Sequence, residues 1–544
     1  MKEPSSPRSF ADELREIAQQ EEARPAVITP STPLNYGQLW HRIDQVGNFL
    51  QQQSIGALAL LADNDLDWII VDLACLAKGI VCIPLPRFFS FDQIHHALHL
   101  SEVDAVAHDP ADLNKLRGKD NRPSWALPST TLSLTFRERT HPAYPPNTAK
   151  ITFTSGSTGT PKGVCLSEEN IQTVVKSLNQ AIFDLNLHTH LSLLPYATLL
   201  ENLAGIYLPF LRGGSIYVAK SDLLGLRGSR METIGPFLQI VDDTKAQSII
   251  IVPQILKMLL DALDSGWRVP ATLKFVAVGG GKTPSAWIQQ AQQHDLPVYE
   301  GYGLSECASV VALNTPRSHK PGSVGRILSH CRVRIEDGEI IVSGNHFLGY
   351  LNPGSVPSPP SIPHHPLGPE TATGDLGFVD EEGYLHIIGR KNNILVSTYG
   401  RNISPEWPET ELLATGLFRQ CLVVGEARPY CIALLIPAAT PLTVPTIQKA
   451  IGNINGRLPD YAQIRQWALL KKPFSIEDGL LTTNGRVKRK AIENTYAGLI
   501  AQLYKDALAK EERHGVLSGT VKKPEPGQNV LQKELSHMRE AIPP

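Results

Sequence analysis

The sequence predicts an α/β fold with a large N-terminal domain of parallel α/β subdomains, a small β-barrel-like part and a small α+β C-terminal domain. Three observations lead to this fold class. Apolar strand patterns alternate with helical patterns in the first half of the chain, hairpin patterns begin near Val333, and a second α/β pattern runs from near Ile394 to near Leu508. The length of 544 residues is too great for one hydrophobic core, so we expect at least two domains.

Parallel α/β structure is expected where strand, helix and strand patterns follow one another. One such unit combines a strand at 58–61, an apolar helical pattern that ends at Gly79, and an apolar run at 80–85. Two more short β-branched runs, 249–252 and 275–278, are bounded by Pro and Gly and also predict strands.

Antiparallel hairpins are expected in the following segment. The sequence RVRIEDGEIIVSG has a turn signal at Asp337-Gly338, and GFVDEEGYLHIIG has one at Glu382-Gly383. Between them, residues 355–369 contain six prolines, which exclude a helix or a central strand and predict a surface loop.

Composition limits the compartment and the partners. The 51 basic and 53 acidic residues give a net charge of −2, so no global electrostatic attraction favours nucleic acid or an acidic membrane as partner. Seven cysteines without a C-x-x-C pair indicate a reduced, cytoplasmic chain. The N-terminus has no apolar segment of a secretion signal, and no apolar run is long enough for a transmembrane segment.

A candidate phosphate-binding loop lies at 152–163, with the sequence TFTSGSTGTPKG. Glycines allow several backbone N–H groups to converge on an anion, hydroxyl groups add donors, and Lys162 adds a positive charge. A polyphosphate is the natural ligand of such a loop. The spacing differs from the P-loop G-x-x-x-x-G-K-[ST], and on composition alone a flexible Ser/Thr/Gly linker remains an alternative.

The segment TSGSTGTPKG resembles the phosphate-binding signature of the acyl- and aryl-adenylate-forming (AMP-binding) enzymes. Similarity to this superfamily recurs in order from about Tyr36 to Ile492 and is greatest to the long-chain fatty acyl-CoA synthetases. The resemblance implies that Lys162 and the preceding residues bind the phosphates of ATP. These preceding residues are Thr154, Ser155, Gly156, Ser157, Thr158 and Gly159.

Further motifs of the family supply expected adenosine, magnesium and CoA contacts. In YEGYGLSE, the resemblance implies that Tyr302 stacks on adenine, Ser305 contacts phosphate and Glu306 helps to hold Mg²⁺, a role for which one carboxylate beside phosphate oxygens suffices. The other expected contacts are Gly301 and Gly303 beside the tyrosine, Asp375 at the ribose, Arg390 at ribose or phosphate, and Gly400 at the pantetheine arm of CoA. A turn glycine remains possible for Gly400.

The resemblance also divides the chain. Asn392 matches the hinge about which the family's small C-terminal domain moves, although an Asn in a connecting turn needs no such role. We therefore expect an ATP- and acyl-binding domain at 1–391, a mobile domain at 392–510 and a polar tail at 511–544. In LLTTNGRVKRKAI, Arg486 stands where the family has a lysine that stabilises transition-state charge. Arginine keeps the charge but is planar and larger.

A second departure concerns the acyl pocket. Fatty-acid members commonly have a histidine near the position of Thr198, which is small and polar here. Tyr196, Gly279 and Gly280 are further candidates for pocket walls, with an ordinary core position as the alternative for the apolar residues of this segment.

The predicted activity is ATP-dependent activation of a carboxylic acid, a medium- or long-chain fatty acid first, to acyl-AMP with release of pyrophosphate, followed by transfer to the thiol of CoA. The expected catalytic residues are Lys162, Glu306 and Arg486. One alternative is a ligase that loads the phosphopantetheine of an acyl carrier protein or another nucleophile. Another is a nucleotide- or acyl-binding protein with impaired catalysis, because of Arg486 and Thr198.

Overall fold

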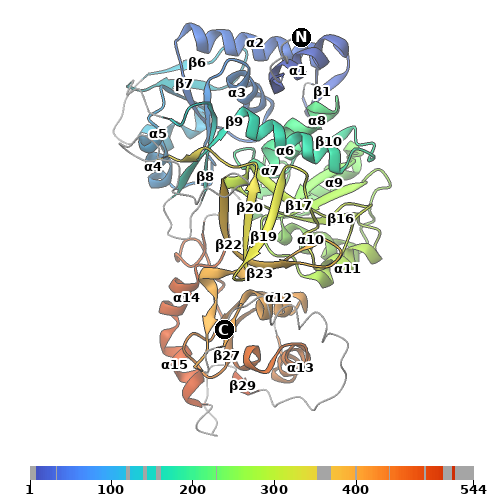
Figure 1. Ribbon diagram of the computed structural model, residues 1–544, viewed down its shortest axis with the longest axis vertical. Helices are drawn as coiled ribbons and strands as arrows, with labels where there is room; N and C mark the ends of the chain where they lie inside the picture. Colours follow the sequence, from blue (N-terminus) through green and yellow to red (C-terminus); the bar gives the residue numbers. More distant parts are fainter. Residues whose placement is uncertain are drawn as a thin grey trace.

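The computed structural model describes residues 8–31, 33–117, 123–138, 144–154, 161–227, 230–351, 369–398, 401–439, 441–482, 485–506 and 518–520. Two large sheets with helices on their faces form the N-terminal part, and a smaller body carries the C-terminal residues (Figure 1). The α/β fold class predicted from the sequence is confirmed.

The first large sheet has eight strands and contains the strand–helix–strand unit predicted near the N-terminus. Strand β3 pairs in parallel with both β4 and β5. In sheet order the strands are β21 (Gly349–Tyr350), β9 (Lys162–Ser167), β8 (Thr148–Thr154), β4 (Val81–Pro84), β3 (Ala57–Leu61), β5 (Ala105–His108), β7 (Ser133–Phe136) and β6 (Ser124–Ala126). The carboxyl end of β8 therefore leads into the expected phosphate loop.

The second large sheet has nine strands. Its centre, β14–β15–β16, is parallel, as the apolar runs at 249–252 and 275–278 predict. In sheet order the strands are β18 (Arg326–Ile327), β17 (Ser309–Leu313), β16 (Val298–Leu304), β15 (Phe275–Val278), β14 (Ser248–Ile251), β10 (Thr189–Leu191), β11 (Ser215–Tyr217), β1 (Pro25–Ile28) and β2 (Leu34–Asn35). A separate small hairpin joins β12 (Leu226–Arg227) and β13 (Arg230–Met231).

Helices fill the space between the two sheets and cover their outer faces. Those between the sheets are α1 (Phe10–Gln20), α2 (Tyr36–Gln52), α3 (Leu66–Ala77), α6 (Glu168–Ala181), α7 (Leu199–Glu201) and α8 (Leu208–Leu211). Those on the outer faces are α4 (Phe91–Ser101), followed by the short α5 (Leu113–Arg117), on the eight-stranded sheet, and α9 (Gly235–Thr244), α10 (Pro253–Asp264) and α11 (Ser285–Gln293) on the nine-stranded sheet. Alternating side chains of each strand thus enter two different cores.

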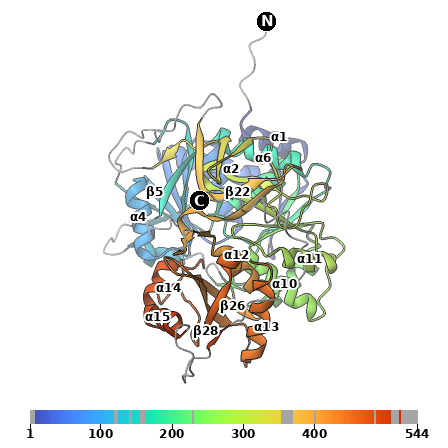
Figure 2. The ribbon, with the colours of Figure 1, turned by 60° about the horizontal axis from the view of Figure 1, so that its bottom comes forward.

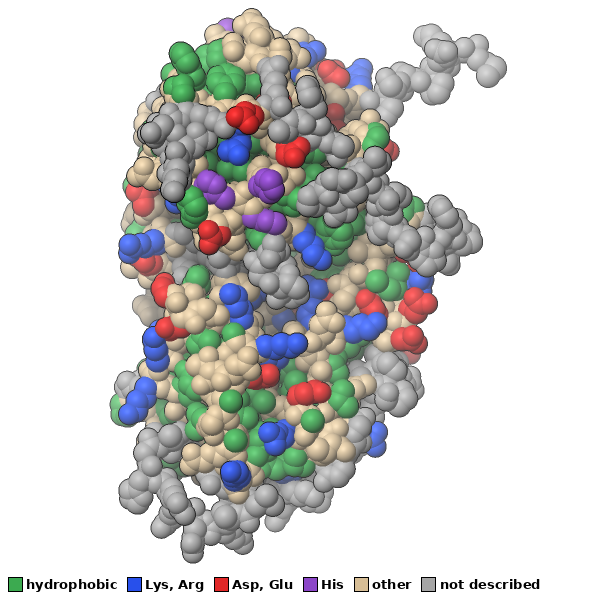
Figure 3. All heavy atoms as spheres, turned by 90° about the vertical axis from the view of Figure 1, so that its left-hand side faces the viewer, with side chains coloured by type: hydrophobic (Ala, Val, Ile, Leu, Met, Phe, Trp, Pro, Cys, Tyr) green, Lys and Arg blue, Asp and Glu red, His purple; other side chains and the backbone are tan. Residues whose placement is uncertain are grey.

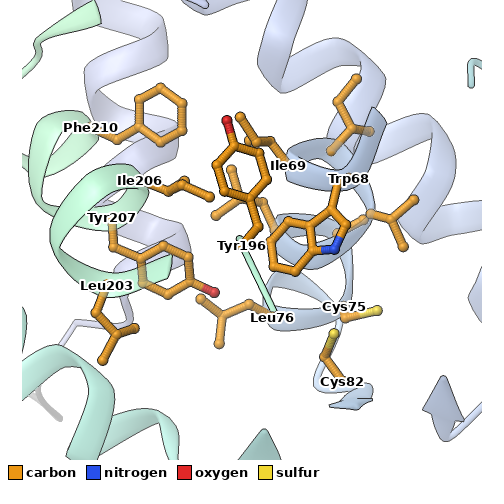
Figure 4. Close-up of a cluster of buried hydrophobic side chains, with 14 of the residues drawn as sticks. Trp68, Ile69, Cys75, Leu76, Cys82, Tyr196, Leu203, Ile206, Tyr207 and Phe210 are labelled. Atoms are coloured by element: carbon orange, nitrogen blue, oxygen red, sulfur yellow. The ribbon is translucent and has the colours of Figure 1, made fainter. Parts of the chain in front are cut away.

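Large aromatic side chains dominate the core between the sheets. Figure 4 shows Tyr196 and Trp68 side by side, with Tyr207 and Phe210 on the neighbouring helical segment. The Trp68 and Tyr196 ring centroids are 5.3 Å apart, and each residue is 1% exposed. The segment Asn202–Tyr207 is a π-helical turn that carries Tyr207 into this core.

Both predicted hairpins are confirmed, and together they form a four-stranded antiparallel sheet. This sheet stands where a small β-barrel-like part was expected, and it is open. Its order is β19 (Cys331–Glu336), β20 (Glu339–Gly344), β22 (Glu370–Val379) and β23 (Leu385–Arg390). Asp337 and Gly338 adopt positive φ angles of 49° and 77° at the first turn, and Gly383 has a φ of 84° at the second. Most of the proline-rich loop lies outside the described residues.

The C-terminal body is a second α/β layer structure, seen from below in Figure 2. Its sheet has the order β26 (Phe418–Val424), β27 (Cys431–Pro437), β28 (Ile464–Leu469) and β29 (Ser518–Thr520). Helices α12 (Glu406–Ala414) and α13 (Val444–Asn455) cover one face, α14 (Arg489–Thr495) and α15 (Ala497–Asp506) cover the other, and the hairpin β24 (Leu395–Val396) and β25 (Asn402–Ile403) precedes α12. Strand β29 lies within 511–544, the segment expected as a polar tail. The sequence did not predict this strand, because three residues with one Thr give no strand signal.

All seven cysteines are free and buried. Among the described residues, none of the helices has the length and apolar character needed to cross a membrane.

Candidate functional site

The candidate site lies where the carboxyl ends of β15 and β16, the four-stranded sheet and the C-terminal body come together. Loops after the carboxyl ends of parallel strands are the usual place for ligands in α/β sheets. Strand β16 carries Gly301, Tyr302 and Gly303, and its pairing with β17 shifts register after Tyr302. A Cβ atom on Gly303 would lie 1.6 Å from the Ser309 carbonyl oxygen, so only glycine fits this close approach.

Asp375 is the centre of a polar cluster that joins three of the predicted residues. The Tyr302 hydroxyl donates to Asp375 Oδ2 over 2.6 Å, and Arg390 Nε lies 2.7 Å from Asp375 Oδ1. Burial raises the pKa of Asp375, and the Arg390 charge and the Tyr302 hydroxyl oppose that rise. Burial and the Asp375 charge raise the pKa of Tyr302, which therefore stays a protonated donor. The cluster offers hydroxyl and carboxylate groups of the kind that hold a ribose diol.

Arg486 reaches this cluster from the C-terminal body. Its Nη2 atom donates to the carbonyl oxygen of Gly280 over 2.6 Å, although the two residues are 206 positions apart in the chain. Arg486 keeps some exposed surface, but packing around it and the nearby Arg390 charge lower its pKa, and the Asp375 charge opposes this. The guanidinium remains cationic at neutral pH.

The short loop that carries Arg486 is held by its own backbone. Thr482 N donates to Arg486 O over 2.7 Å, and Arg486 N donates to the Thr482 hydroxyl over 3.1 Å. At the end of the loop, Arg489 Nη2 donates to both carboxylate oxygens of Glu409 of α12, over 2.8 and 3.0 Å, and Arg489 Nη1 donates to the Val423 carbonyl oxygen. The loop is therefore fixed to the body of the C-terminal part.

Two guanidinium groups lie close to the Asp375 carboxylate at this junction. Arg390 pairs with it directly, and the Arg486 charge also acts on it, as does the carboxylate of Glu406. Figure 3 shows Lys and Arg side chains gathered across the middle of the face, where the upper and lower parts of the molecule meet. Cationic side chains gathered on one face favour an anionic ligand such as a polyphosphate.

Lys162 and Glu306 lie on either side of Tyr350, a residue that the sequence analysis did not single out. The Lys162 ammonium is 5.4 Å from the centre of the Tyr350 ring, and the Tyr350 hydroxyl donates to Glu306 Oε1 over 2.7 Å. Burial and Glu306 raise the pKa of Tyr350, which keeps its proton for that hydrogen bond. Thr154 pairs with Lys162 at the end of β8, and residues 155–160 lie outside the described residues.

Glu306 fits the needs of a magnesium ion. Mg²⁺ usually takes one or two carboxylates from the protein and completes its shell with phosphate oxygens and water. Among the described residues there is no group of three or more His, Cys, Asp or Glu side chains arranged around a metal position. The half-buried Glu306 carboxylate, held by the Tyr350 hydroxyl, suits the mode in which Mg²⁺ enters with a polyphosphate.

The expected acyl-pocket residues are distributed over two places. Gly279 and Gly280 follow β15 and lie at the junction, where Gly280 accepts the Arg486 hydrogen bond. Tyr196 instead packs fully buried in the core between the sheets, beside Trp68 (Figure 4). The Thr198 hydroxyl donates to the Pro195 carbonyl oxygen over 2.7 Å just before α7, so it closes a local turn.

Two further predictions concern the junction itself. Asn392 lies in a 3₁₀ turn, Lys391–Asn393, directly after β23, which places it on the connection between the N-terminal part and the C-terminal body. Ser305 opens a 3₁₀ turn, Ser305–Cys307, after β16. Gly400 lies outside the described residues.

Two residues of this region were not predicted from the sequence. Glu300 is buried, and Lys282 lies at the junction. Thr283 N donates to Glu300 Oε1 over 3.1 Å, and burial raises the pKa of Glu300 to about 7. Lys282 Nζ donates to the Ile388 carbonyl oxygen over 3.1 Å. The only sequence signal for them is proximity to the motifs, because Glu300 precedes Gly301 and Lys282 follows the Gly279–Gly281 turn.

Two family models match the chain. The AMP-binding enzyme model matches residues 14–351, and the model of the AMP-binding enzyme C-terminal domain matches residues 392–508. The first match alone covers more than half of the chain.

Among curated proteins, the long-chain-fatty-acid–CoA ligase FadD15 of Mycobacterium bovis is 25% identical over 532 residues, which cover 80% of this chain and 86% of that protein. A 2-succinylbenzoate–CoA ligase of Bacillus cytotoxicus is 31% identical over 295 residues, covering 51% of this chain and 56% of that protein. Similarity to the second relative therefore spans only about half of either chain.

Among solved structures, o-succinylbenzoate CoA synthetase (MenE) of Bacillus subtilis, in complex with the acyl-adenylate intermediate OSB-AMP, superposes with a TM-score of 0.73 at 21% identity, over 89% of this chain and 98% of that one. The same enzyme in complex with ATP and a magnesium ion gives a TM-score of 0.69 at 20% identity, over 88% and 98% of the two chains. At this identity the similarity shows a shared fold.

Proposed function

We propose that this chain, which belongs to the AMP-binding enzyme family and is an AMP-forming acid–thiol ligase, activates a fatty acid with Mg-ATP and transfers the acyl group to the thiol of CoA. The observation that carries this proposal is the position of Arg486. It lies beside the Asp375–Tyr302–Arg390 cluster and is bound to Gly280, so a cation from the C-terminal body reaches the predicted nucleotide site.

The first step joins the acid to the nucleotide. A carboxylate oxygen attacks the α-phosphorus of ATP, the bond from that phosphorus to the bridging oxygen breaks, and pyrophosphate leaves. Arg486 and Lys162 would stabilise the negative charge that develops on the phosphates, because preorganised cations act on the transition state without reorganisation. Asp375 and Tyr302 would hold the ribose and adenine. Glu306, oriented by Tyr350, would bind Mg²⁺, which neutralises phosphate charge when present.

The second step transfers the acyl group. The sulfur of the thiol attacks the acyl carbonyl carbon and the thiol proton passes to solvent. The bond from that carbon to the phosphate oxygen breaks, and AMP leaves. We assign residues 1–391 to ATP and acid binding and residues 392–510 to a mobile domain hinged at Asn392. The segment 511–544 follows as a tail, of which strand β29 joins the sheet of the mobile domain. The match of the C-terminal family model to residues 392–508 supports this division.

A fatty acid is the substrate we favour. The similarity to the mycobacterial fatty-acid ligase extends over 80% of this chain, whereas the similarity to the 2-succinylbenzoate ligase extends over 51%. The motifs YEGYGLSE at 299–306 and GRNISPEW at 400–407 resemble those of the long-chain fatty acyl-CoA synthetases and support the same choice. We also place the enzyme in the cytoplasm, because seven free thiols persist best in a reducing compartment.

An acceptor panel tests the proposal. The purified chain is incubated with Mg-ATP and fatty acids of several lengths, and with 2-succinylbenzoate, in the presence of CoA, a holo acyl carrier protein or hydroxylamine. We expect AMP and a fatty acyl-CoA thioester. A thioester on the carrier protein without acyl-CoA would show a carrier-loading ligase instead, and ATP binding without AMP formation would show a binding protein with impaired catalysis.

A further inference from the structure

The loop 279–282, directly after β15, makes two contacts, one with the C-terminal body through Gly280 and one with the four-stranded sheet through Lys282. At the first, the Gly280 carbonyl oxygen accepts the hydrogen bond of Arg486, with Gly280 in a left-handed conformation at a φ of 78°. At the second, two residues later, the Lys282 ammonium reaches the end of β23. The orientation of the carbonyl that receives Arg486 thus depends on how the rest of this short loop is held.

The Ile388 carbonyl oxygen is the meeting point of the loop and the C-terminal body. Lys282 Nζ donates to it over 3.1 Å, and the Ser404 hydroxyl lies 3.1 Å from it on the other side of the junction. The same hydroxyl is 3.0 Å from Glu406 Oε2, so its single proton is shared between two acceptors. Glu406 Oε1 in turn accepts a hydrogen bond from Asn393, next to the expected hinge.

The junction around Ile388 is closely packed. Ser404 is 2% exposed, and a Cβ atom on Gly389 would lie 2.0 Å from the Ser404 hydroxyl oxygen. Of the charges that act on Lys282, Glu300 comes from β16, and Glu406 and Glu411 come from α12 of the C-terminal body. Burial lowers the pKa of Lys282, and these three carboxylates oppose that shift. Those of Glu406 and Glu411 also attract the ammonium toward the C-terminal body.

We propose that Lys282 is a positioning residue for Arg486: through the Ile388 carbonyl oxygen it holds the loop 279–282 so that the Gly280 carbonyl keeps the Arg486 guanidinium at the phosphates. This inference rests on the proposed function. It assigns Lys282 no contact with the reacting atoms, and its effect passes through Gly280 and Arg486.

The test compares Lys282→Met with Lys274→Met. Lys274 is a matched control, because it is an exposed lysine that also donates to a backbone carbonyl, that of Asn186, at 3.1 Å. Pyrophosphate release at saturating Mg-ATP and acid is expected to fall by about 10- to 100-fold in Lys282→Met, the usual effect of a slightly displaced catalytic group. The dissociation constant for Mg-ATP, measured by calorimetry, is expected to stay within about twofold of the wild-type value, because ground-state binding does not depend on Arg486 placement.

A double-mutant comparison separates positioning from general damage to the structure. In an Arg486→Lys background, whose shorter ammonium does not keep the Gly280 bond, Lys282→Met should lower the rate by no more than about twofold further. Ser404→Ala, which removes a second contact at Ile388, should share this dependence on Arg486.

Equal fold losses in both backgrounds, or a Lys282→Met rate equal to that of Lys274→Met, would overturn the proposal. If the wild-type chain releases no pyrophosphate with any acid, the proposed function itself fails, so the two failures are distinguishable.

Discussion

At the scale of single residues, Arg486 is the side chain on which the chemistry depends most. The sequence shows an arginine where related enzymes have lysine, and the structure shows its hydrogen bond to Gly280. A guanidinium has five N–H donors, so it can hold the carbonyl and an anion at the same time. The structure therefore supplies, next to this position, a backbone acceptor that binds the arginine in place of the family's lysine.

Replacing this arginine by lysine tests whether the hydrogen bond to Gly280 contributes to catalysis. We expect Arg486→Lys to lower the rate of pyrophosphate release by about tenfold, because the ammonium keeps the charge but loses the contact with Gly280. Arg486→Ala should lower it by about 10²- to 10³-fold, as when an electrostatic stabiliser is removed. Single-turnover measurements at saturating Mg-ATP give both values. An Arg486→Lys rate equal to or above that of the wild type would show that Gly280 contributes nothing to the site.

Glu300 makes stability depend on pH. Burial raises its pKa from 4.5 to about 7 in the folded chain, so the folded state binds the proton more tightly than the unfolded state does. The favourable contribution of this group is complete below pH 4.5 and is lost as the pH rises through about 7. Glu300→Gln should therefore stabilise the chain at pH 8, by on the order of 2 kcal/mol, and leave it nearly unchanged near pH 4.5.

Melting temperatures of the two proteins at pH 4.5, 6 and 8 measure this effect. The exposed Glu381→Gln is the control, and its effect on the free energy of unfolding should stay within about 0.5 kcal/mol at each pH. A Glu300→Gln variant that is less stable than the wild type at pH 8 would contradict the assignment.

At the scale of secondary-structure elements, Arg489 anchors the loop of Arg486 to α12. Both partners of the Arg489–Glu409 pair have side chains only 11% exposed. Breaking a buried pair leaves an uncompensated charge, so we expect Arg489→Met to destabilise the C-terminal body by about 3–5 kcal/mol. It should also lower pyrophosphate release, because α14 begins only three residues after Arg486.

The matched control is Arg457→Met, in the same body. Arg457 pairs with Glu411 at 2.8 Å but is 51% exposed, and surface pairs contribute about 0–1 kcal/mol. Urea denaturation of both variants gives the comparison. Equal losses of stability would show that the buried Arg489 pair contributes no more to the free energy of unfolding than the exposed Arg457 pair does.

Elements with a strong local pattern were predictable from the sequence. Phe275–Val278 forms the predicted strand, and the turns at Asp337-Gly338 and Gly383 close the predicted hairpins, because side-chain period and turn conformation are local properties. Tyr196 shows the limit of such reasoning. Its proximity in sequence to a motif suggested a pocket wall. Its position in the core beside Trp68 depends on a helix more than a hundred positions earlier in the chain.

At the scale of the whole molecule, the junction between the two parts brings distant motifs into one site. Tyr302 and Asp375 are 73 positions apart, and Gly280 and Arg486 are 206 apart. The sequence supplied these motifs through family resemblance. It did not supply Tyr350, Lys282 or the Ile388 carbonyl, because contacts between remote segments leave no periodic signal in the chain.

Formation of an acyl-adenylate at this junction can be measured as acid-dependent exchange of pyrophosphate into ATP in the absence of CoA. We expect labelled pyrophosphate to enter ATP only when a suitable fatty acid and Mg²⁺ are present, and we expect Arg486→Ala to abolish most of this exchange. Absence of exchange with every acid in a folded, ATP-binding preparation, or cleavage of ATP to ADP and phosphate, would contradict acyl-adenylate formation.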